Sequence, residues 1–180
     1  MLGNFGLSYD QSKGQLAVWA ILAAPFLLST DLRTIDPEMR VLLQNRHVIA
    51  VNQDKMGISG RMVSRINSIE FWTRRIEPMA GDEYSYAVAF VSRRTDGAPF
   101  AFNVRLDDLF LTNKHGYKVK DIFNVNRTEY KILQSDIFEE RVNPTGANMY
   151  IFEAMSFGTR QTQSVIAFAL VLILAICRLF

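Results

Sequence analysis

The sequence predicts an α+β fold, in which a helical N-terminal part precedes an antiparallel β-sandwich and an apolar helical tail closes the chain. Before residue 57, apolar residues recur at intervals of three and four, which is the period of a helix. After residue 60, short runs rich in β-branched and aromatic residues alternate with turn-forming residues, as in antiparallel strands. The chain is 49% hydrophobic and 21% charged, a composition that supports a globular core.

The first predicted helix begins at Ser8, because Gln11 follows at the spacing of a capping box. Pro25 is expected to end this helix, since proline clashes with the preceding turn. Its apolar face comprises Leu16, Trp19, Ala20, Ala23 and Phe26, and further apolar residues widen that face almost all round. A helix of this kind must be packed on more than one side.

A second helix is predicted at Asp36-Pro37-Glu38, which supplies an N-cap, a proline at the first helical position and an early acid. Val48, Ile49 and Val51 form a third short apolar cluster, and Gly57 and Gly60 mark a boundary after it. Eight strands are then predicted, at residues 60–65, 69–75, 84–92, 98–105, 117–123, 128–133, 137–142 and 147–154. Strands at such regular spacing favour an antiparallel sandwich.

The apolar tail runs from Val165 to Phe180 and includes thirteen uncharged residues up to Cys177. As a helix this run is only about 20 Å long, whereas a bilayer core is roughly 30 Å thick. We expect one of three roles: a cleavable lipid-anchor signal, a marginal membrane helix, or a tail without an anchoring role. Cys177 is the single cysteine, so no internal disulfide is expected.

The distribution of charged residues and of histidines argues against several classes of function. The formal net charge is +2 and the basic residues are scattered, which argues against a nucleic-acid partner. His47 and His115 are the only histidines and lack metal-ligand spacing, and no glycine-rich phosphate loop occurs. We therefore expect no metal site and no cofactor.

Several blocks of the chain resemble the glycoside hydrolase family of α-galactosidases and α-N-acetylgalactosaminidases. The strongest are Gly3–Ser8, Leu16–Pro25, Ser29–Arg33, Leu42–Asn45 and Val48–Asp54, which fall in the family's order and spacing. The resemblance is weaker but continuous through the sandwich, for example at Ser92–Asp96 and Asn143–Gly146, and it fails at the apolar tail.

This resemblance implies a (β/α)8 barrel followed by a C-terminal sandwich. Residues 1–57 would then be the end of an incomplete barrel, residues 58–156 the sandwich, and residues 157–180 a polar spacer with the tail. It further implies a retaining hydrolase that releases terminal α-linked galactose or N-acetylgalactosamine from glycolipids, glycoproteins or oligosaccharides. The family is homodimeric and lysosomal or secreted. Its two catalytic aspartates lie on mid-barrel strands, so we expect no catalytic or assignable substrate-binding residue in this chain.

A substitute pair of catalytic carboxylates is not evident. A retaining glycosidase needs two carboxyl groups about 5–5.5 Å apart. Asp107-Asp108 and Glu139-Glu140 are adjacent in sequence, and neighbouring strand residues face opposite sides of a sheet. We interpret Asp31, Asp36 and Asp54 as caps and loop hydrogen-bonders.

Two tryptophans suggest sugar stacking, but core positions are the simpler interpretation. Trp19 lies on the buried helix. Trp72 shares a predicted strand with Phe71, so one of these two rings is expected to point outward. Asn126-Arg127-Thr128 is an N-glycosylation sequon in a polar turn, and Asn126 is the one modification site we predict.

Two functions follow from these observations. The first is a fragment of the hydrolase, inactive alone because the catalytic aspartates are absent. The alternative is a non-catalytic module or isoform that binds carbohydrate or the full-length enzyme. Without a barrel, the first helix is expected to leave Leu16, Trp19, Leu22 and Phe26 in water, so the isolated chain should aggregate or fold only after residue 60.

Overall fold

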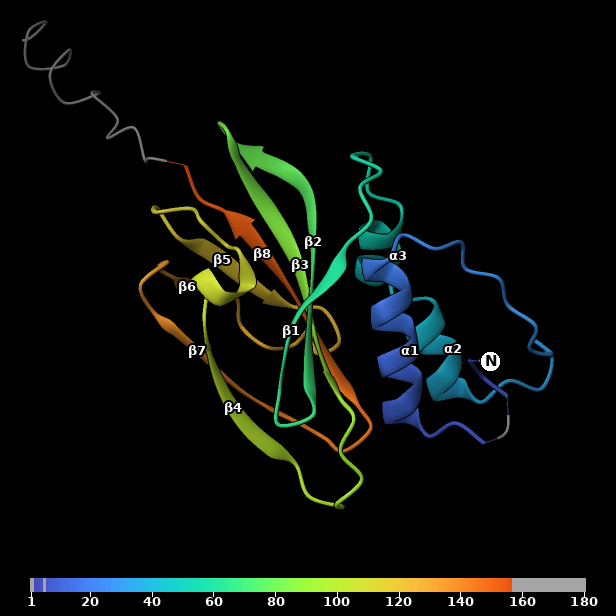
Figure 1. Ribbon diagram of the computed structural model, residues 1–180. Helices are drawn as coiled ribbons and strands as arrows, with labels where there is room; N and C mark the ends of the chain where they lie inside the picture. Colours follow the sequence, from blue (N-terminus) through green and yellow to red (C-terminus); the bar gives the residue numbers. More distant parts are fainter. Residues whose placement is uncertain (1, 5, 157–180) are drawn as a thin grey trace, which may run out of the picture.

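The computed structural model describes residues 2–4 and 6–156, in which three α-helices precede eight β-strands (Figure 1). The elements are α1 (Tyr9–Ile21), α2 (Pro37–Leu43), α3 (Arg46–Asn52), β1 (Arg61–Ile66), β2 (Ile69–Ala80), β3 (Glu83–Ser92), β4 (Phe100–Arg105), the 3-10 helix η1 (Asp107–Leu109), β5 (Tyr117–Asp121), β6 (Tyr130–Ile132), β7 (Ile137–Val142) and β8 (Ala147–Ala154). All eight predicted strands are present, with boundaries shifted by a few residues.

The strands form two antiparallel sheets. Six strands pair in the order β1-β2-β3-β8-β5-β6, and β4 pairs with β7 in a second, two-stranded sheet. The largest boundary difference is in β2, which continues past Arg75 to Ala80 because its pairing with β3 extends to Ala80 opposite Glu83. The helices lie against one face of the six-stranded sheet, and β4 and β7 lie on the other side (Figure 1).

The space between the two sheets is filled by aromatic rings. Phe90 stacks on Phe138 with ring centroids 5.3 Å apart, and Phe71 meets the edge of Phe90 at 5.5 Å. Tyr150 and Phe152 on β8 complete this layer. Offset and edge-on ring pairs add to the stabilisation that burial of the rings provides.

The opposite face of the same sheet is buried as well, under the helices. Along β3, Val88 and Phe90 point into the sandwich, whereas Ala87, Ala89 and Val91 point toward α1. Successive strand residues alternate between the two faces of a sheet, which places these alanines on the face toward α1. Their small side chains leave room for α1 to approach the sheet closely. The six-stranded sheet is therefore the middle of three layers.

This third layer corrects the expectation that α1 is left in water without a barrel. Leu16 is only 2% exposed, because the sandwich's own sheet buries it. Trp19 and Phe26 are half-buried and lie with ring centroids 5.3 Å apart. Leu22 is the member of the predicted set that is exposed, at 39%. The expectation was thus wrong for Leu16 and holds for Leu22.

The helix starts follow the sequence signals. Ser8 and Gln11 form the predicted capping box of α1, and the Asp36 carboxylate accepts hydrogen bonds from the first-turn amides of α2. The cluster at Val48–Val51 is a helix, α3, which Asn45 caps by accepting from the amides of His47 and Val48. The Asn45 side chain also donates to the carbonyl of Ile122 at 2.6 Å and so ties α3 to the end of β5.

A buried cation joins the helices to the sheet. Arg74 on β2 is 2% exposed, and its Nη1 lies 2.8 Å from the carbonyl oxygen of Ala20 and 2.6 Å from that of Val51. These carbonyls lie in the last turns of α1 and α3, where backbone acceptors lack partners within the helix. A positive charge there also favours both helix dipoles. Burial lowers the pKa of Arg74, and Asp54 opposes that change.

Gly60 lies where the helical layer meets β1 and β2. Its amide donates to the carbonyl of Ile21 at 2.8 Å. A Cβ atom at this position would lie 2.5 Å from both the Ile21 side chain and the Thr73 carbonyl oxygen, so only glycine permits this approach.

The apolar tail from Val165 to Phe180, including Cys177, lies outside the described residues. Within residues 2–4 and 6–156, no helix has both the length and the apolar character needed to cross a membrane.

We predict that Arg74→Met lowers the free energy of unfolding by about 2–4 kcal/mol, because it removes the hydrogen bonds of a buried guanidinium to the helix-end carbonyls of Ala20 and Val51. Arg74→Lys should lose less, since an ammonium group keeps the charge and several donors. Arg75→Met in the same strand is the control, and its exposed side chain should cost no more than about 1 kcal/mol. Urea denaturation measures all three variants. Equal losses for Arg74→Met and Arg75→Met would contradict the proposed role of the buried guanidinium.

Candidate functional site

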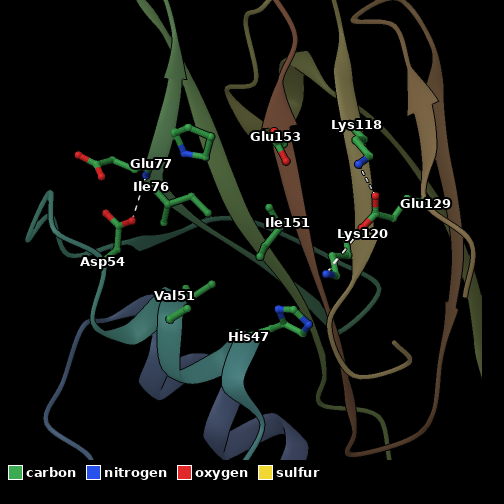
Figure 2. Close-up of a pocket in the computed structure, with 12 residues that line it drawn as sticks. His47, Val51, Asp54, Ile76, Glu77, Lys118, Lys120, Glu129, Ile151 and Glu153 are labelled. Atoms are coloured by element: carbon green, nitrogen blue, oxygen red, sulfur yellow. Dashed lines mark hydrogen bonds and ion pairs between the residues drawn. The ribbon is translucent and has the colours of Figure 1, made fainter. Parts of the chain in front are cut away.

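A cleft of about 240 Å³ opens beside α3, on the face of the six-stranded sheet that the helices leave partly uncovered (Figure 2). Its walls come from α3, the end of β2, β5 and β8, and from the loop before β6. The lining includes His47, Val51, Asp54, Ile76, Glu77, Lys118, Lys120, Glu129, Ile151 and Glu153. This cleft gathers seven ionisable side chains.

Asp54 and Glu77 form one wall. The Asp54 carboxylate accepts a hydrogen bond from the Met56 amide at 3.1 Å and another from the Glu77 amide at 3.0 Å. Asp54 therefore fixes the loop after α3 against β2, as the loop interpretation predicted. Both of its oxygen atoms are occupied by backbone donors, which makes it a poor candidate for proton transfer.

Lys118, Lys120 and Glu129 form the opposite wall (Figure 2). Glu129 forms an ion pair with Lys118, and its other oxygen lies 3.6 Å from Nζ of Lys120. The hydrogen bond from Lys118 lowers the pKa of Glu129. Glu129 thus stays ionised, which is the wrong protonation state for a general acid.

His47 extends from the first turn of α3 toward Lys120 (Figure 2). Burial lowers the pKa of His47, and the positive charge of Lys120 lowers it further, while Glu129 opposes both effects. The positive end of the α3 dipole also disfavours an imidazolium there. His47 is therefore a neutral imidazole at neutral pH.

The cleft offers charged and polar side chains to a small polar ligand. Asp54 accepts hydrogen bonds from backbone amides and Glu129 pairs with lysines, and no aromatic side chain lines the cleft as a platform for a sugar ring. No group of three or more His, Cys, Asp or Glu residues within the described ranges is arranged to hold a metal ion.

A second polar cluster joins β5, β7 and β8, and sequence reasoning missed it. The Tyr150 hydroxyl and the Arg127 guanidinium both hydrogen-bond to the Glu140 carboxylate. Asp121 lies 3.8 Å from Arg127 and accepts from the amides of Phe123 and Asn124 at 3.0 and 2.9 Å.

The two carboxyl groups of this cluster have pKa values shifted in opposite directions. Desolvation raises the pKa of Asp121 above its usual range. Desolvation acts the same way on Glu140, but hydrogen bonds from Tyr150, the Arg141 amide and Arg127 outweigh it and lower that pKa. Opposite shifts are typical of an acid–base pair. Here, however, both carboxylates lie beside Arg127, and each also accepts a hydrogen bond from at least one backbone amide, as in a structural network.

The remaining predicted residues are dispersed. Asp107 and Asp108 lie in η1 and not on a strand, so the argument from strand alternation was wrong for them. Glu139 is exposed on β7, whereas Glu140 belongs to the polar cluster. His115 is exposed in the turn before β5, far from His47 in the sequence, and Asn126 is exposed in the turn before β6.

Neither tryptophan offers an open platform. Trp72 faces the helical layer, is half-buried, and its Nε1 donates to the Glu70 carboxylate at 3.1 Å. The expectation that Trp72 or Phe71 points outward was wrong, because both faces of the sheet are covered. Trp19 lines a shallow groove beside α1.

We predict that lowering the pH reduces the free energy of unfolding, in part because of His47. Its folded pKa lies below that of the unfolded chain, about 6.5, so the unfolded state binds the proton first and stability falls below that pH. His47→Gln should therefore lose less stability than the wild type between pH 7 and pH 5, measured by urea denaturation. Lys120→Gln should reduce the wild-type loss. Parallel pH profiles for wild type and His47→Gln would contradict this assignment.

Two family models match the chain. The model described as alpha galactosidase A matches residues 1–54, and the model of the alpha galactosidase A C-terminal beta sandwich domain matches residues 57–146. The chain is also similar to the fold of alpha-galactosidase I from Mortierella vinacea, with a TM-score of 0.72 at 19% identity, over 87% of this chain and 39% of that one.

Curated relatives agree with the family models. The alpha-N-acetylgalactosaminidase of Gallus gallus is 41% identical over 151 residues, which cover 83% of this chain and 36% of that protein. Human alpha-galactosidase A is 40% identical over 109 residues, covering 61% of this chain and 24% of that protein. The matched region spans about a third of the first relative and about a quarter of the second. It belongs to the glycoside hydrolase family of alpha-galactosidase A and alpha-N-acetylgalactosaminidase.

Proposed function

We propose that this chain is the C-terminal part of a retaining glycoside hydrolase that releases terminal α-linked galactose or N-acetylgalactosamine. The observation that carries the proposal is the 41% identity to an alpha-N-acetylgalactosaminidase over 151 residues, which spans both the helical layer and the sandwich. The substrates would be glycolipids, glycoproteins or oligosaccharides, and the working enzyme would be a homodimer, as the family resemblance implies.

Within this enzyme, the described residues would have a supporting and not a catalytic role. Double displacement needs one free carboxylate as nucleophile and a second carboxyl group as acid and base. The buried Glu70 is paired with Arg65 and Arg93, Glu140 accepts hydrogen bonds from Arg127 and Tyr150, and Asp54 accepts from backbone amides, so none of these three is a free carboxylate. We therefore assign the catalytic aspartates to residues outside this chain.

A groove of about 420 Å³ between α1 and the end of β3 supports an interface with further protein. It is lined by Leu7, Gln11, Gly14, Gln15, Val18, Trp19, Leu22, Val91 and Arg93. Apolar surface of this kind is stabilised when another protein layer covers it. The same groove supports the alternative function, a non-catalytic isoform that binds carbohydrate or a full-length enzyme of the family.

Activity on nitrophenyl α-galactoside and nitrophenyl α-N-acetylgalactosaminide tests the proposal. We expect no hydrolysis by this chain alone. We expect hydrolysis, with retention of anomeric configuration, when the chain replaces the matching third of the Gallus gallus relative in a chimera. Hydrolysis by the isolated chain would overturn the supporting role. A folded chimera without activity, or binding of the isolated chain to the intact relative, would favour the alternative.

We also propose that the protein enters the secretory pathway and is lysosomal or secreted, with a glycan on Asn126. The side chain is exposed in the turn between β5 and β6, where an oligosaccharide meets no packed neighbour. Expression in a secreting eukaryotic cell should give a product whose mass falls on treatment with an amidase that removes N-glycans. Asn126→Gln should abolish this change, whereas Asn124→Gln in the same turn should not. An unmodified wild-type product would contradict the site.

A further inference from the structure

A third pocket, of about 250 Å³, lies at the edge of the sandwich, and its charged lining residues are all arginines. It is lined by Ile58, Ser59, Gly60, Arg61, Thr73, Arg74, Arg75, Tyr86 and Phe110. None of these residues is acidic, in contrast to the cleft beside α3 and the Glu140 cluster. Arg74 directs its guanidinium to helix carbonyls, which leaves Arg61 and Arg75 as the cations available to a ligand.

The strand register brings these two arginines together. Arg61 on β1 is paired with Thr73 on β2, and Arg75 follows Thr73 by two residues on the same face. Diagonal neighbours of this kind have Cα atoms about 7–8 Å apart, within which two long side chains converge on one small group. Both side chains are exposed at the pocket.

Neither guanidinium is neutralised. Among residues 2–4 and 6–156, the ion pairs include carboxylate partners for Arg65, Arg93 and Arg127 but none for Arg61 or Arg75. Each of the two rests instead against an aromatic ring. Cζ of Arg61 lies 5.4 Å from the Phe110 centroid, and Cζ of Arg75 lies 4.8 Å from the Tyr84 centroid. Such contacts orient a guanidinium and leave its N–H donors free.

Phe110 adds an independent observation. The residue is 52% exposed and its backbone has φ 61°, a left-handed conformation that is unfavourable for a bulky residue. The turn is held by the Phe110 amide, which donates to Asp107, and by the Leu111 amide, which donates to Leu106. The left-handed residue ends η1 as its C-cap, and it leaves the side chain exposed at the pocket.

We infer that the pocket between Arg61 and Arg75 binds an oxyanion, namely a sulfate or phosphate group, either free or as an ester on a sugar. Planar guanidinium forks match the oxygens of such groups bidentately. The Phe110 ring beside them offers an apolar contact to the rest of an esterified ligand. The inference does not depend on the proposed hydrolase activity, because it concerns binding alone.

The test titrates the full chain with sulfate, phosphate, galactose 6-sulfate and galactose at constant ionic strength, and follows the arginine Nε–H resonances by NMR. We expect the Arg61 and Arg75 resonances to shift with the three anions. A tighter response to galactose 6-sulfate than to sulfate identifies a sugar ester as the ligand, and an equal response identifies the free oxyanion. Shifts with galactose as large as those with its sulfate ester would overturn the inference, as would unshifted resonances.

Matched variants distinguish a specific binding site from a general effect of positive charge. Arg61→Gln with Arg75→Gln should weaken sulfate binding at least about tenfold, the loss expected for charge-assisted hydrogen bonds. Arg40→Gln with Arg46→Gln removes the same charge from exposed positions on α2 and α3, and should leave binding within about twofold. Arg61→Lys with Arg75→Lys should be intermediate, because charge is kept and the forks are lost. Equal weakening of sulfate binding in the two double glutamine variants would contradict the site.

Discussion

The arrangement of the helical layer depends on one buried guanidinium. Arg74 reaches from the sheet to the last turns of two helices that are otherwise separate in sequence, and satisfies backbone acceptors of both. Burying a cation is costly unless acceptors surround it, and here oriented backbone dipoles supply part of the compensation: Nη1 contacts three carbonyls, whereas Nε is buried without a hydrogen-bond partner. The Asn52 side chain strengthens the same junction by donating to the carbonyl of Ala24 at 2.8 Å. The positions of α1 and α3 then determine where the groove beside α1 and the cleft beside α3 open.

The six-stranded sheet is a middle layer because its residues differ in size on the two sides. Large rings fill the space toward β4 and β7, and alanines with a few aliphatic residues face α1. A flat, small-residue surface accepts a helix at close range, which is why α1 is well buried without any neighbouring barrel strand. The uncovered end of this surface, beyond α3, carries the paired charges of Lys118, Lys120 and Glu129.

The elements set by local signals were predictable, and those set by distant contacts were not. Helix caps and turns depend on residues that are close in the sequence, as at Ser8, Asp36, Gly81 and Gly97. Helices and strands could therefore be located from the sequence. Arg74 lies 54 residues from its acceptor Ala20, and Tyr150 lies 23 residues from Arg127. No periodicity marks such partners. The burial of Leu16 was misjudged for the same reason, since the covering residues are on β3 and β8.

The contact at Gly60 has a consequence for how the molecule tolerates insertions. The chain passes here between the Ile21 side chain and the Thr73 carbonyl, with no space for even a methyl group. The connection from the helices to the sandwich is therefore closely packed at Gly60 and is not a flexible linker. It also contains the gap between the two matched family segments, at residues 55–56. An added peptide would separate the layers here, whereas the open turn at Gly97 has no atom within 4 Å of its missing Cβ and would accommodate one.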